Sequence, residues 1–127
     1  MIPIYRAFSE TFDKYILGVP YFSDGRYYML VDDCNKNNNI GSGSYPIDET
    51  TLAIHFPDMI ASQGNIIFAS LQKDGRGGDV CSVNDYIDSG LEGVAIYQNY
   101  GFRIDRKGKA MGISLSSTDI KIIGIQQ

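Results

Sequence analysis

The chain has 127 residues, of which 43% are hydrophobic and 20% are charged, and its formal net charge is −4 at pH 7. This length is sufficient for a hydrophobic core, and the moderate charge excludes an intrinsically disordered chain. The acidic balance disfavours nonspecific nucleic-acid binding, because affinity for phosphates comes from lysine and arginine.

Extended segments separated by turn residues fill the N-terminal half. Aromatic and β-branched residues predict strands over residues 3–8, 14–19 and 51–56, and a hairpin over residues 20–31. The turn of that hairpin is predicted at Ser23, Asp24 and Gly25. Residues 32–44 have no apolar period, so we expect the longest loop there. Residues 57–62 are compatible with one helical turn that starts at a proline.

Short β-prone runs also fill the C-terminal half. They predict strands over residues 66–71, 80–83, 93–98, 100–104, 109–113 and 119–126. Gly75, Gly77 and Gly78 predict a tight turn between the first two, because glycine adopts positive φ angles that other residues disfavour. Residues 114–118 are compatible with a second helical turn.

About ten short strands without an amphipathic helix of ten or more residues predict an all-β fold of the sandwich or small-barrel type. The natural boundary separates an N-terminal β unit, residues 1–63, from a C-terminal small barrel, residues 64–127. The two parts could also pack as a single domain.

Three segments resemble the YopX family of phage and prophage proteins. They are the opening run Ile4-Tyr5-Arg6-Ala7-Phe8, the central run Phe68 to Arg76 followed by Gly78-Asp79-Val80, and the closing run Asp119 to Gly124. The chain departs from the family pattern at Phe8, where tryptophan is usual, and at Gly77, where glutamate is common. The resemblance implies an all-β fold with an SH3-like barrel in the C-terminal half and a phage or prophage origin. It also allows for oligomerisation and implies no catalytic residue.

Residues that could carry chemistry are few and scattered. His55 is the only histidine and has no adjacent nucleophile, so we expect a structural or surface role for it. Two thiols, Cys34 and Cys81, with one histidine fall short of a tetrahedral metal site. We therefore expect no catalytic residue, no cofactor and no metal. The opening residues do not resemble a signal peptide and no apolar run is long enough for a membrane span, which favours a cytoplasmic protein with reduced thiols. A Cys34–Cys81 disulfide stays open, because it depends on spatial approach.

A mildly basic segment near the C-terminus is the main candidate contact patch. Residues 93–127 contain five basic and two acidic side chains, whereas residues 1–92 contain six and thirteen. Three aromatic residues are followed there by four basic ones, and the candidate residues are Tyr97, Tyr100, Phe102, Arg103, Arg106, Lys107 and Lys109. The rings could stack on bases while the cations meet phosphates. Alternatively, the charges solvate a hairpin and the rings pack in the core.

Three classes of function follow from these observations. We expect a non-enzymatic accessory protein of phage type that contacts another protein or a second copy of itself. The first alternative is a nucleic-acid-binding barrel that uses the contact patch. The second is a small-ligand-binding protein with a pocket between the two halves or between subunits. None of the three involves a membrane.

Overall fold

The computed structural model describes residues 3–32, 38–55, 66–84, 91–99, 101–106, 109–112 and 119–127, and every regular element in these ranges is a strand. The all-β prediction is therefore confirmed. The N-terminal half contains β1 (Ile4–Ser9), β2 (Lys14–Ser23), β3 (Arg26–Val31), β4 (Gly43–Pro46) and β5 (Asp48–His55). The C-terminal half contains β6 (Ala69–Ser70), β7 (Asp79–Asn84), β8 (Leu91–Gln98), β9 (Gly101–Arg106), β10 (Lys109–Gly112) and β11 (Asp119–Ile125). The helical turns expected over residues 57–62 and 114–118 lie outside the described residues.

In the N-terminal half, β5, β1, β2, β3 and β4 are neighbours in that order, and each pair is antiparallel. The turn between β2 and β3 has two residues, Asp24 at φ 51° and Gly25 at φ 78°. Two successive positive φ angles match the right-handed twist of the flanking strands, so the hairpin predicted from Ser23-Asp24-Gly25 is confirmed.

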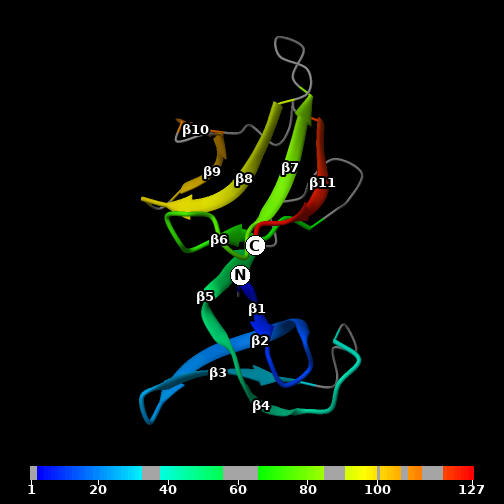
Figure 1. The fold of residues 1–127 in the computed structure, drawn as a ribbon, viewed down its shortest axis with the longest axis vertical. Coiled ribbons are helices and arrows are strands. Elements are labelled where there is room, and N and C mark those ends of the chain that lie inside the picture. The colour runs from blue at the N-terminus through cyan, green and yellow to red at the C-terminus, as the bar shows by residue number, and fades with distance from the viewer. Residues whose placement is uncertain are drawn as a thin grey trace.

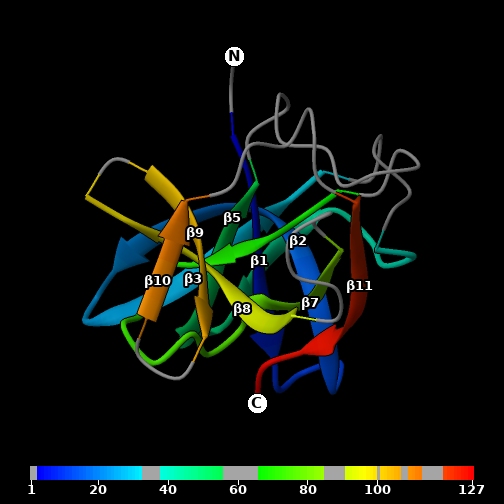
Figure 2. The same ribbon diagram turned by 90° about the horizontal axis from the view of Figure 1, so that it is seen from above.

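In the C-terminal half, β8 pairs with β9, β7 and β6, while β10 extends from β9 and β11 from β7. The sheet curls into a half-barrel, with β10 and β11 on opposite sides in both views (Figures 1 and 2). The short pairing of β5 with β6, Ala53 with Ser70 and Ile54 with Ala69, joins the two halves.

Each half has a hydrophobic core of its own. The N-terminal cluster consists of Ala7, Ile16, Met29, Val31 and Ile47. The C-terminal cluster consists of Ile67, Ala69, Cys81, Ala95, Ile104 and Ile120. Figure 1 shows the two halves one above the other, with β1 and β5 between them.

Two elements depart clearly from the prediction, because β4 was not predicted and β6 is much shorter than predicted. β4 begins at Gly43, inside the predicted loop, because the backbone of β3 provides its pairing partners. The strand predicted over residues 66–71 shrinks to the two residues of β6. The Phe68 carbonyl oxygen accepts a hydrogen bond from the Asp79 N–H, and the Phe68 N–H donates to the Asp79 carboxylate. Phe68 therefore does not extend the pairing of β6 with β5.

Candidate functional site

The predicted contact patch is divided between the two faces of the C-terminal sheet. Tyr97 and Phe102 lie opposite each other on β8 and β9, with ring centroids 4.8 Å apart, and both pack against the C-terminal core. Arg103 follows Phe102 in the same strand, so its side chain leaves the sheet on the other face, where it pairs with Ile96. The structure thus joins the two rings but separates them from the nearest cation.

The remaining patch residues give less information. Arg106 and Lys109 are paired in register on β9 and β10, which brings two basic residues to the end of one hairpin. Tyr100 and Lys107 lie outside the described residues. A combined aromatic and basic surface stays a prediction, and the inward packing of Tyr97 and Phe102 favours their role in the core.

Cys81 is a buried thiol with no solvent-accessible surface. Burial, together with the negative charge of Asp79, raises the pKa of the thiol to about 12. The nucleophilic form of cysteine is the thiolate, so a thiol with this pKa is inert near neutral pH. Cys34 lies outside the described residues, so the Cys34–Cys81 disulfide that the sequence left open stays open.

His55 is also part of the interior, with 3% of its surface exposed. Its Nδ1 lies 3.2 Å from the carbonyl oxygen of Ile67, so this nitrogen carries the proton and donates. Desolvation lowers the pKa of the imidazole, although the Ile67 carbonyl and the charge of Asp79 oppose the effect. Of the structural and surface roles expected for this histidine, its burial favours the structural one.

The pKa of His55 predicts how stability changes with pH. Because the folded-state pKa is below the ordinary value near 6.5, the unfolded chain binds the proton more readily. Above about pH 6.5, we expect His55 to have no effect on the pH dependence of stability. As pH falls below that value, we expect protonation of His55 in the unfolded chain to lower the free energy of unfolding. The slope cannot exceed about 1.4 kcal/mol per pH unit. Urea titrations between pH 7.5 and 5.5 should show a smaller decrease for His55→Gln than for the wild type, and equal decreases would contradict the assignment.

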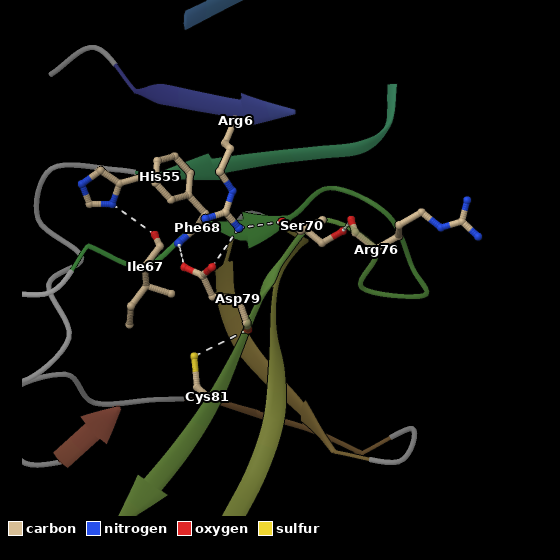
Figure 3. A network of polar contacts seen from close by, with 9 residues as sticks. Arg6, His55, Ile67, Phe68, Ser70, Arg76, Asp79 and Cys81 are labelled. Carbon is tan, nitrogen blue, oxygen red and sulfur yellow. Dashed lines mark hydrogen bonds and ion pairs between the residues drawn. The ribbon is translucent and has the colours of Figure 1, made fainter. Parts of the chain in front are cut away.

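An ion pair joins the two halves at their junction (Figure 3). Arg6, on β1, donates from Nη2 to Oδ1 of Asp79, on β7, over 2.8 Å, and to the carbonyl oxygen of Gly77 over 2.9 Å. Asp79 is 2% exposed and the Arg6 side chain is 12% exposed. Water therefore screens this pair little.

The other groups around Asp79 complete its bonding. Oδ2 accepts a hydrogen bond from the Phe68 backbone N–H over 2.8 Å, and the Asp79 N–H donates to the Phe68 carbonyl oxygen. The Phe68 ring lies 4.6 Å from the Arg6 guanidinium carbon, a cation–π contact. Both carboxylate oxygens of Asp79 already accept hydrogen bonds. Asp79 therefore holds β1, the Phe68 segment and its own strand β7 together, and it is not an exposed base.

The glycine-rich turn predicted before β7 closes this junction. Gly75 and Gly77 adopt φ angles of 78° and 83°, which confirms the predicted positive φ for these two glycines, whereas Gly78 does not have a positive φ. The Ser70 hydroxyl donates to the Arg76 carbonyl oxygen over 2.7 Å and accepts from the Gln72 N–H. The Gly77 N–H donates to the Gln126 carbonyl oxygen, so the turn also holds the end of the described chain.

An exposed apolar surface on the β2–β3 hairpin is the feature that sequence reasoning missed. Eight large hydrophobic side chains are exposed among the described residues, and five of them belong to this hairpin: Val19, Tyr21, Phe22, Tyr27 and Leu30. Val19 pairs with Leu30, and Tyr21 pairs with Tyr28 in a stacked arrangement with centroids 5.6 Å apart.

These pairs lie on the face opposite the core residue Met29, and this face is called the outer face below. It consists of Val19 and Tyr21 on β2, Arg26, Tyr28 and Leu30 on β3, and Asp32 directly after β3. A groove of about 290 Å³ borders it, lined by Leu17, Val19, Leu30 and Asp32 among others. Contiguous apolar surface rimmed by polar groups is typical of a protein contact site.

Comparisons of the chain with protein-family models, with curated proteins and with solved structures found no match. Within the described residues, no histidine, cysteine, aspartate and glutamate side chains gather in a group of three that could hold a metal ion. The same part of the chain contains no helix with the length and hydropathy of a membrane span.

Proposed function

We propose that this protein is a non-enzymatic interaction module that contacts protein chains through the outer face of the β2–β3 hairpin. The observation that carries the proposal is the exposure of Val19 and Leu30, 52% and 51%, side by side on a regular sheet. Leaving such aliphatic side chains in water costs free energy that contact with another protein recovers.

The state of the reactive side chains supports a function without catalysis. Cys81 is a buried, protonated thiol, and His55 is buried against the Ile67 carbonyl. Asp79 is bonded through both carboxylate oxygens. The resemblance to YopX proteins of phage and prophage supports the same class of accessory protein.

Photo-crosslinking from the outer face tests the proposal. A benzophenone amino acid at position Leu30 should form an adduct with a protein chain in producing cells. Ile123 on β11 is the matched control, because its exposure of 48% is close to the 51% of Leu30. Adducts from position 30 but not from position 123 are expected. Absence of any protein adduct at position 30, or equal yields at both positions, would overturn the proposal.

A further inference from the structure

The outer face has an ordered charge pattern along β3. Arg26, Tyr28 and Leu30 follow one another at every second position of β3, so their side chains leave the strand on one side, and Asp32 follows directly after the strand. Asp32 lines the groove together with Leu30, which places it beside the apolar pairs. The face therefore begins with a cation, continues with an aromatic and an aliphatic side chain, and ends with a carboxylate.

This pattern is symmetric about Met29. Arg26 and Asp32 are each three residues from it, and Tyr28 and Leu30 are each one residue away. A twofold axis that crosses β3 at this point turns the strand end for end. It exchanges the positive end with the negative end and the aromatic position with the aliphatic one. Such self-complementarity is what an interface between two identical chains requires.

We propose that the outer face is the interface of a twofold homodimer in which β3 crosses antiparallel over the partner's β3. This inference rests on the proposed function and specifies its partner as a second copy of the chain. In this arrangement Arg26 faces the partner's Asp32, and Tyr28 packs over the partner's Leu30. Each contact occurs twice because of the symmetry.

The size of the face explains why its charged ends matter. Of the four apolar side chains, Val19, Tyr21 and Leu30 are 38–52% exposed and Tyr28 is half-buried, so the apolar centre of the face is small. A standard interface buries about 800 Å² on each partner. The apolar centre alone is too small, so the dimer must also include its polar ends. The groove beside Leu30, about 290 Å³, provides space for the rings of the partner's stacked tyrosines.

Arg26 is available for such a contact. Arg26 is an exposed residue, and it lines a cavity that Glu10, Asp48 and Glu49 also line. Among the described residues the ion pair of Arg6 with Asp79 is present, but Arg26 forms none. The guanidinium can therefore meet a carboxylate of a second copy without breaking an internal ion pair in this part of the chain.

Charge reversal tests this inference on the purified full chain by sedimentation equilibrium. The wild type should be a dimer, and Arg26→Glu or Asp32→Lys alone should weaken it about tenfold or more, because each places like charges opposite each other twice. Mixing the two variants in equal amounts should restore a heterodimer, since every facing pair is then of opposite charge. Lys121→Glu, an exposed residue on β11, is the control for a change of net charge and should leave the dimer unchanged.

The outcomes separate this inference from the proposed function. A monomeric wild type, or a dimer that both single variants leave intact, would overturn the homodimer. Failure of the mixture to restore association would do the same, and successful restoration excludes misfolding of the variants as the cause. If the wild type is monomeric but the crosslinker at Leu30 still captures a different protein, the interaction function stands and only the homodimer fails.

Discussion

Replacing Gly77 with alanine is expected to lower the free energy of unfolding by about 3–5 kcal/mol, a large share of the stability of a small domain. Gly77 has a φ of 83°, which strains any residue with a Cβ atom. An added Cβ would also overlap the backbone carbonyl of Thr51 on β5. The backbone of Gly77 cannot shift freely to relieve this overlap, because its N–H and its carbonyl both form hydrogen bonds.

Gly25 provides a matched control for this substitution. It has a similar φ of 78°, but an added Cβ would meet no atom within 4 Å. Gly25→Ala should therefore cost only the backbone strain, about 1–2 kcal/mol. Urea unfolding followed by far-ultraviolet circular dichroism measures both variants. Equal losses would show that packing against Thr51 contributes nothing.

The strands and turns of this fold could be predicted from the sequence because their signals are local. The β2–β3 hairpin follows from Ser23-Asp24-Gly25 and from the β-prone residues beside it. β4 could not be predicted, because Gly43 to Pro46 has little β-propensity and is ordered by pairing with β3. The division into an N-terminal unit and a C-terminal barrel stays a prediction, although each half contains a buried cluster.

The outer face could not be identified from the sequence for a specific reason. In β3, apolar residues occupy both alternate sets of positions: Tyr28 and Leu30 on one side, and Tyr27 and Met29 on the other. Alternation then shows that there are two faces but not which of them is buried. The three-dimensional packing of Met29 against Ile16 and Val31 in the N-terminal core decides this.

The junction was equally hidden from sequence reasoning. Arg6 and Asp79 are separated by 73 positions, and neither has a local motif that points to the other. The glycine-rich turn before Asp79 and the resemblance of both segments to the YopX family imply no contact between these two residues. The pairing depends on how β5 and β6 bring the two halves together, which is a property of the tertiary structure.

Removing one member of the Arg6–Asp79 pair is expected to destabilise the protein by about 3–5 kcal/mol, because the remaining charge is left buried without compensation. Asp79→Asn is the informative change, since the amide oxygen can still accept the Phe68 N–H and the side-chain shape is kept. Arg6→Met should cost a similar amount and also removes the cation–π contact with Phe68. Arg76→Met is the control, because that exposed guanidinium makes only a 3.3 Å contact with Thr50 and should cost less than about 1 kcal/mol.

The double variant Arg6→Met/Asp79→Asn shows whether the two residues act as a pair. Direct contact predicts that its loss of stability is smaller than the two single losses added together, by more than about 1 kcal/mol, because the second substitution removes a charge that the first has already left unpaired. Urea unfolding of the four proteins at pH 7 gives this coupling energy. Additive losses would mean that the ion pair contributes nothing of its own, and that Arg6 stabilises the junction through the Phe68 ring and the Gly77 carbonyl instead.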